Sequence, residues 1–75
     1  MDIKQLVIEA KRLIPDCYDY AQNWLDDIKE TADFVEGPEQ AIRYFMMGMF
    51  LAGAITIVQL EEFEGIVKGM NKVLH

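Results

Sequence analysis

The sequence predicts an all-α domain of four helices, at about residues 2–14, 16–35, 38–52 and 57–74, of which the last two form an αα-hairpin. Apolar residues recur at the helical period along these segments. Pro15, the Gly37-Pro38 pair and Gly53 fall where one segment gives way to the next. The last segment opens with Thr56 and Gln59, which have the spacing of a helix-starting capping box.

The first expected helix is amphipathic and ends before proline. Asp2 and Gln5 have capping-box spacing. Pro15 disfavours helical geometry at the residue before it. Ile8 lies outside the apolar stripe, which comprises Ile3, Leu6, Val7, Ala10, Leu13 and Ile14.

The second expected helix, residues 16–35, has the clearest division into an apolar and an acidic side. The apolar stripe comprises Cys17, Tyr20, Ala21, Trp24, Leu25, Ile28, Ala32 and Val35. We expect Cys17 to be a core residue, because free cysteine is commonly buried. Tyr18 and Phe34 lie off the stripe. We expect them either to be exposed contacts or to pack against a neighbouring helix. The acidic side comprises Asp19, Asp26, Asp27, Glu30 and Asp33.

The third expected helix, residues 38–52, is apolar all round. Pro38 suits a first helical position, because its φ is already helical and it has no amide to lose. From residue 41 to 52 only Arg43 is charged. A helix of this kind is normally buried on all sides, which a four-helix monomer of 75 residues can hardly achieve. We therefore expect part of this helix to lie in a homodimer or other protein interface. The expected anchors are Tyr44, Phe45, Met47, Met49, Phe50 and Leu51.

The uncharged stretch 44–60 admits a membrane span as an alternative, since its seventeen residues are at the lower limit for crossing a bilayer. Gly53 and Thr56 argue against a span, because they end one helix and begin another, and the turn would expose backbone groups to lipid. Gly53 suits the left-handed residue that closes a helix. Ile55 and Leu60 suit a hydrophobic staple around the Thr56 cap.

The segment AGAITIVQLEEFEGIVKGM resembles a pattern of short bacterial and phage helical proteins, including the SHOCT-type short C-terminal domains. The resemblance is carried by Gly53, Ile55 and Thr56, with Gln59 where that pattern has an acidic residue and Leu60 where it has an aromatic one. The lysines usual in the motif are largely missing. The resemblance implies oligomerisation or protein contacts, and no functional residue is carried over from it.

Composition narrows the range of partners. The chain is one domain, residues 1–75, with a formal net charge of −6. This charge disfavours direct binding to nucleic-acid phosphates and to anionic membrane surfaces. One cysteine and one histidine exclude an internal disulfide and a zinc framework, so oligomerisation is the remaining support for so small a core. The free cysteine and the lack of a signal-peptide pattern predict a cytoplasmic protein.

The residues do not predict an enzyme. The chain has no serine, its only histidine is His75, and its carboxylates follow neither the EF-hand nor the di-iron pattern, so we expect no catalytic, metal or cofactor site. Residues 16–39 contain eight acidic residues and a single base, Lys29. This run predicts either a solubilising surface or a face that docks a basic protein.

The sequence therefore predicts a small non-enzymatic interaction or regulatory protein of bacterial or phage type, expected to form a homodimer. One alternative is a phage-type inhibitor that mimics nucleic-acid charge to block a basic protein surface. A second is a helix-turn-helix DNA-binding regulator, which Glu61, Glu62 and Glu64 on the recognition helix disfavour.

Overall fold

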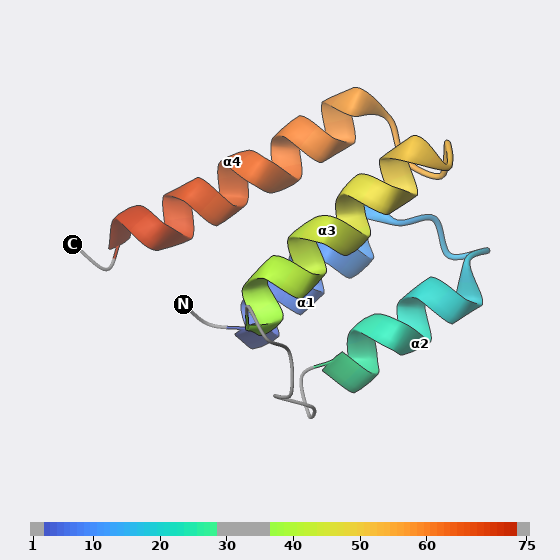
Figure 1. Cartoon of the computed structure of the whole chain (residues 1–75), viewed down its shortest axis with the longest axis horizontal. Helices are drawn as coiled ribbons and strands as arrows, with labels where there is room; N and C mark the ends of the chain where they lie inside the picture. The colour runs from blue at the N-terminus through green and yellow to red at the C-terminus, as the bar shows by residue number, and fades with distance from the viewer. Residues whose placement is uncertain (1–2, 29–36, 74–75) are drawn as a thin grey trace.

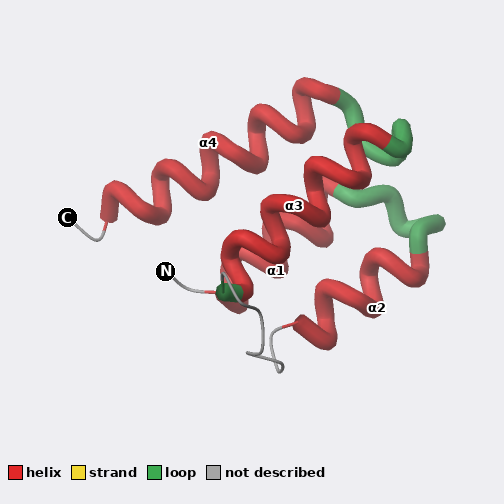
Figure 2. Tube along the Cα trace, in the orientation of Figure 1, coloured by secondary structure: helices red, strands yellow, loops and turns green. Residues whose placement is uncertain are grey.

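A computed structural model of the chain shows four α-helices: α1 (Ile3–Leu13), α2 (Asp19–Ile28), α3 (Pro38–Leu51) and α4 (Ile57–Val73) (Figure 1). The structure describes residues 3–28 and 37–73. Helices α3 and α4 form the predicted hairpin, and a turn drawn in green joins them (Figure 2). Helix α1 packs against each of the other three, and α3 also packs against α4. The all-α class and the four-helix organisation are confirmed.

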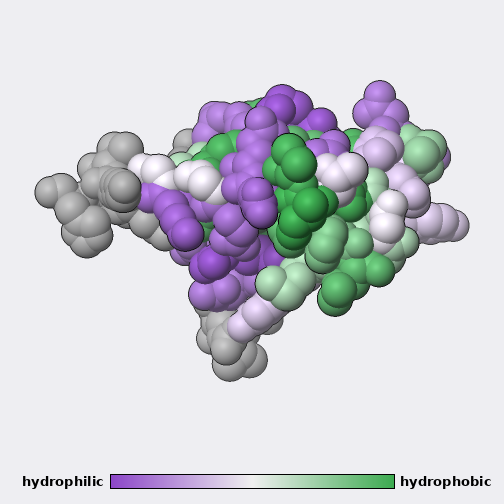
Figure 3. Space-filling view, turned by 90° about the horizontal axis from the view of Figure 1, so that it is seen from above, coloured by the Kyte–Doolittle hydropathy of each residue, from purple (hydrophilic) through white to green (hydrophobic). Residues whose placement is uncertain are grey.

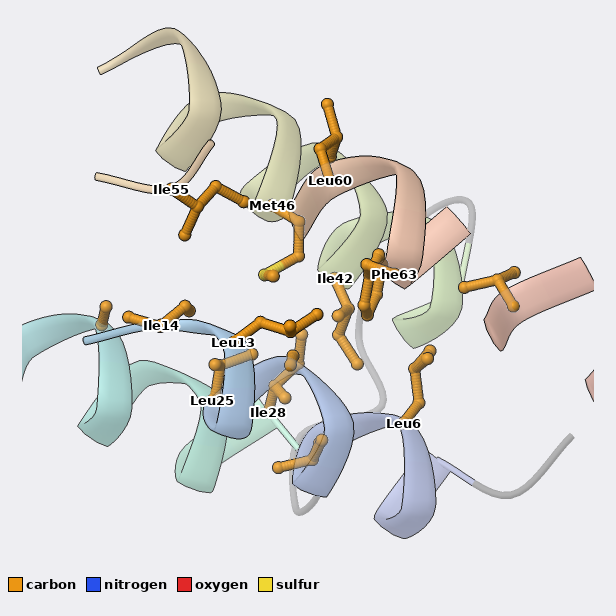
Figure 4. Packing of buried hydrophobic residues seen from close by; sticks show 14 residues of the cluster. Leu6, Leu13, Ile14, Leu25, Ile28, Ile42, Met46, Ile55, Leu60 and Phe63 are labelled. Atoms are coloured by element: carbon orange, nitrogen blue, oxygen red, sulfur yellow. The ribbon is translucent and has the colours of Figure 1, made fainter. Parts of the chain in front are cut away.

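The core lies where α1 meets the other helices. The expected stripe of α1 is confirmed, since Leu6, Val7, Ala10 and Leu13 are buried and Ile8 is exposed. Figure 4 shows Leu6 and Leu13 of α1 in one cluster with labelled side chains of α2, α3 and α4. The buried cluster comprises Leu6, Val7, Ala10, Leu13, Ile14, Ala21, Leu25, Ile28, Ile42, Met46, Ile55, Leu60, Phe63 and Val67.

The carboxyl end of α1 is closed by side chains from other helices. Because Pro15 has no amide N–H, it cannot donate a helical hydrogen bond to the Lys11 carbonyl. Instead, the side-chain amide of Gln22 in α2 donates to the Lys11 carbonyl at 3.3 Å and to the Ile14 carbonyl at 3.1 Å. The side-chain amide of Gln59 in α4 donates to the Leu13 carbonyl at 3.2 Å. Three carbonyls that the helix leaves open are thereby satisfied.

The turn between α3 and α4 has the predicted form. Gly53 adopts a φ of +82°. Its amide donates to the Phe50 carbonyl and that of Ala54 to the Met49 carbonyl, at 2.9 and 2.8 Å. This pair of bonds is the Schellman motif, which ends a helix at a left-handed residue.

The capping box that begins α4 is also confirmed. The Gln59 amide N–H donates to the Thr56 hydroxyl at 3.1 Å, and the Thr56 amide N–H donates to the Gln59 side-chain oxygen at 2.7 Å. Ile55 and Leu60, the expected staple residues, are both buried in the core.

Helix α2 begins later than the sequence predicts. The Tyr18 amide donates to the Pro15 carbonyl at 3.1 Å, so a turn precedes the helix and α2 starts at Asp19. The prediction that Cys17 is a core residue is wrong, because it lies in this turn and is exposed. Tyr20 is also not on the buried stripe, since 93% of its surface is exposed. The rest of the expected helix, 29–35, lies outside the described residues.

Ion pairs join neighbouring helices. Lys11 of α1 meets Asp26 of α2 at 2.7 Å, and Arg43 of α3 meets Glu64 of α4 at 2.9 Å. The i,i+4 spacing favours a pair between Glu64 and Lys68 within α4. In the structure, Glu64 instead forms its ion pair with Arg43, across the hairpin.

Arg12 of α1 joins this set of contacts. It meets Glu9 of its own helix at 2.9 Å and Glu62 of α4 at 3.6 Å. The hydrogen bond to the Glu9 carboxylate, with a contribution from Glu62, raises the pKa of Arg12. Arginine is already fully protonated at ordinary pH, so this change adds no pH dependence there.

Candidate interaction surface

Helix α3 is buried on one side only. Ile42 and Met46 face the core and are fully buried, whereas Tyr44, Met47 and Leu51 are 60%, 46% and 77% exposed. The described part of the chain therefore leaves one side of this helix uncovered, as expected for a monomer of this size. Residues at 44, 47 and 51 share one face of a helix. This leaves an uncharged, apolar strip on the side of α3 that points away from α1.

The strip continues onto the start of α4. Ile57 and Val58, in the first turn of that helix, are both exposed. Ile57 lies four and seven residues before Glu61 and Glu64, so the three share a side of α4, and Glu64 contacts Arg43 of α3. Ile57 is therefore on the side of α4 that faces α3. We name Tyr44, Met47, Leu51 and Ile57 the outer face. Seen from above, hydrophobic side chains gather on the half of the molecule toward the α3–α4 turn (Figure 3).

A second apolar surface, the α2–α3 groove, lies on the other flank of α3. It encloses about 380 Å³ and is lined by Tyr18, Tyr20, Ala21, Trp24, Phe45 and Met49. The rings of Trp24 and Phe45 stack across it, with centroids 4.3 Å apart and planes inclined by 24°. A stacked aromatic pair stabilises a contact beyond the area that it buries. None of the six lining residues is charged, so the groove suits apolar side chains.

The groove follows from the way the helices sit on α1. Helix α2 packs against α1, while α3 packs against α1 and α4. The backbones of α2 and α3 are less closely packed on each other than either is on α1, and α2 stands apart from α3 in Figure 1. The aromatic stack bridges the two helices. Between them, half-buried side chains form the floor and Tyr20 stands exposed at the edge.

The six anchors predicted from sequence fall on three sides of α3. Phe45 and Met49 line the groove, and Tyr44, Met47 and Leu51 lie on the outer face. Phe50 is partly buried against the core cluster. Gly48 lies between the two surfaces and is exposed, with open space where a Cβ would be. The groove and the outer face are thus separated only by a position without a side chain.

The predicted acidic side of α2 is seen in part. Asp19 and Asp27 are exposed. Asp26 binds Lys11 and so contributes to the α1–α2 contact. Glu30 and Asp33 lie outside the described residues. From residue 13 to 28 the chain has four acids, Asp16 being the fourth, and no lysine or arginine.

Within 3–28 and 37–73, no three histidine, cysteine or carboxylate side chains gather closely enough to hold a metal ion. None of the described helices combines the length and the apolar composition needed to cross a membrane.

Comparison of the chain with protein-family models, curated proteins and solved structures found no match. The resemblance of the Gly53–Leu60 region to SHOCT-type domains therefore stays a prediction. What the protein does has to be inferred from its own surfaces.

The sequence did not predict the groove. Tyr20 and Trp24 were assigned to the core stripe of a helix that started too early. A signal was nevertheless present, since two tyrosines and a tryptophan occur within seven residues, from Tyr18 to Trp24. Tyrosine and tryptophan are enriched at interfaces, where one end of the side chain stays in water.

Proposed function

We propose that this is a small, non-enzymatic interaction protein that acts by binding other protein chains, and that it binds a second copy of itself through the outer face. The observation that carries the proposal is the exposure of Tyr44, Met47 and Leu51 along one side of an uncharged helix. Monomeric soluble proteins rarely leave such contiguous apolar surface in water. Tyrosine and methionine are also enriched in interfaces.

Size supports self-association. Within the described part of the chain the core has fourteen buried residues, which is small, and domains of 75 residues often gain stability from oligomerisation. Two copies related by a two-fold axis would place the same strip on both sides of the interface. Because the strip on α3 carries no charge between residues 44 and 51, this contact does not oppose like charges.

The Leu51→Asp variant tests this proposal. Leu51 is largely exposed, so the change leaves the core intact while placing a charge in the interface. We expect the wild-type protein to have about twice the chain mass of 8.7 kDa in solution, and Leu51→Asp to have the mass of one folded chain. Multi-angle light scattering gives the mass and circular dichroism the helix content.

Ile8→Asp is the matched control, since Ile8 is also an exposed apolar residue but lies on α1. This variant should keep the dimer mass. A wild-type protein that has the mass of a single chain at all concentrations would refute self-association.

The acidic side of α2 supports docking of a basic protein surface as a further part of the same function. Asp19 and Asp27 are exposed on this helix, and Asp16 is exposed in the turn before it. Charge of one sign steers the encounter with a partner of the other. A surface that otherwise holds nucleic-acid phosphates is one such partner, and inhibition by charge mimicry is the second candidate function.

A further inference from the structure

We infer that the α2–α3 groove receives a single amphipathic α-helix of a partner protein, with apolar side chains entering the groove and lysine or arginine along its edges. The inference rests on the proposal that the protein binds other chains. It concerns a surface separate from the outer face and names the chemistry of the occupant.

The shape of the groove fits one helix. On the helices, its lining runs from Tyr20 to Trp24 of α2 and from Phe45 to Met49 of α3. At about 1.5 Å per residue each of these stretches is roughly 6 Å long, which is about one helical turn. Side chains at positions i and i+4 of a bound helix are also about 6 Å apart along the axis and face one side, so they can enter the groove together. An extended peptide is less suited, because neither wall is a sheet edge that would pair with its backbone.

The lining fits apolar anchors. Trp24 and Phe45 already stack, so they provide a preformed floor that joins the two walls. Met49 on the α3 wall adds an unbranched side chain that can adjust to the shape of a partner. Tryptophan and tyrosine are the residues most often found at the energetic centre of interfaces. The groove therefore has both a rigid and an adaptable side.

The charges beside the groove select a basic occupant. Asp27 follows Tyr20 by seven residues and Trp24 by three, so helical spacing puts it beside the groove. Asp16 lies in the turn two residues before Tyr18, which lines the groove, and is exposed. On the α3 wall, the only base among the described residues is Arg43, and its guanidinium binds Glu64 on the opposite side of that helix.

A second copy of the chain is disfavoured here for the same reason. Inserting its own α2 would bring acidic residues against acidic residues, whereas a helix edged with lysine or arginine is complementary. Steering by opposite charge also makes the expected binding weaken as salt rises.

A fluorescence titration tests the inference. The probe is an 18-residue peptide with leucines at i, i+3, i+4 and i+7 spacing, lysines at all other positions, and no aromatic residue. Trp24 is the only tryptophan of the chain and lies in the groove, so its emission reports occupancy. We expect saturable binding of one peptide per chain, with a gain in peptide helicity by circular dichroism.

Peptide controls separate the groove from general attraction to an acidic protein. A peptide of the same composition with the leucines spread around the helix, and one with glutamate in place of each lysine, should each bind at least about tenfold more weakly. If either binds as tightly as the first peptide, the inference is wrong.

Protein variants locate the site. Tyr20→Ala should weaken binding by about tenfold without affecting folding, because Tyr20 is almost fully exposed. Met49→Lys should weaken it further, and Ile8→Ala should leave it unchanged. Equal affinity in wild type and Tyr20→Ala would overturn the assignment. The assignment would also be overturned if Met49→Lys abolished the dimer while Leu51→Asp did not. The groove would then be occupied by a second copy of the chain. Leu51→Asp itself should keep its peptide affinity, so the test of the outer face and that of the groove give separate answers.

Discussion

Gln59 joins the start of α4 to the end of α1 through one side chain. Its side-chain oxygen accepts the Thr56 amide and its backbone amide donates to the Thr56 hydroxyl, which begins α4. Its side-chain nitrogen donates to the Leu13 carbonyl, which closes α1. The capping box was predictable from local spacing, but the bond to Leu13 joins residues far apart in sequence and depends on the packing of α4 against α1.

The two roles of Gln59 can be tested separately. Gln59→Glu keeps an oxygen for the Thr56 amide but replaces the donor to Leu13 by a second oxygen. We expect the free energy of unfolding to fall by about 1 kcal/mol, the usual value of one such bond. The measurement is the urea midpoint. Gln40→Glu, the same chemical change in the first turn of α3, is the control and should leave the midpoint unchanged or slightly higher. A midpoint for Gln59→Glu equal to wild type would mean that the bond to Leu13 contributes nothing.

Thr56→Ala tests the cap itself. Removing the hydroxyl leaves the Gln59 amide N–H without its partner, and loss of such a cap costs about 1 kcal/mol. The same urea titration measures the loss. Thr56→Ser retains the hydroxyl and should recover most of the stability. Equal midpoints for all three proteins would contradict the capping box.

At the scale of the elements, the hairpin depends on one backbone conformation. Gly53 has a φ of +82°, which a residue with a side chain rarely adopts. We expect Gly53→Ala to lower the free energy of unfolding by about 1 kcal/mol or more, although a Cβ at this position would touch nothing. Thermal or urea unfolding measures the change.

Gly65 provides the opposite control. It lies within α4, is exposed and has open space around the position of a Cβ. Gly65→Ala should therefore raise stability by about 0.5–1 kcal/mol, because alanine favours the helical state. If both substitutions changed stability in the same direction, the special conformation of Gly53 would not be what sets the turn.

Elements whose boundaries are set locally could be predicted from the sequence. The α1 stripe, the Pro38 start of α3 and the turn at Gly53 follow from periodicity and from proline and glycine chemistry. The start of α2 could not be predicted in this way, because the apolar period continues back through Tyr20 and Cys17. The Pro15–Tyr18 turn, not the period, decides where that helix begins.

At the scale of the whole molecule, the sides of each helix that stay exposed to solvent were harder to predict than the helices themselves. The composition of α3 predicts that it needs cover, and the structure shows which side α1 and α4 leave open. The groove depends on the position of α2 on α1, which no local pattern contains. The acidic border of the groove depends on which carboxylates of α2 form ion pairs with other helices, as Asp26 does with Lys11.

The central claim is that another protein chain covers the outer face of α3 in solution. Met47 reports this directly, because its thioether is accessible to hydrogen peroxide only when that face is open. We predict that the oxidation rate of Met47, measured by mass spectrometry, falls as protein concentration rises through the dimer range, and stays high in Leu51→Asp. Met46, which is fully buried, provides the slow reference at every concentration. A Met47 rate that is the same at all concentrations and in both proteins would contradict the account.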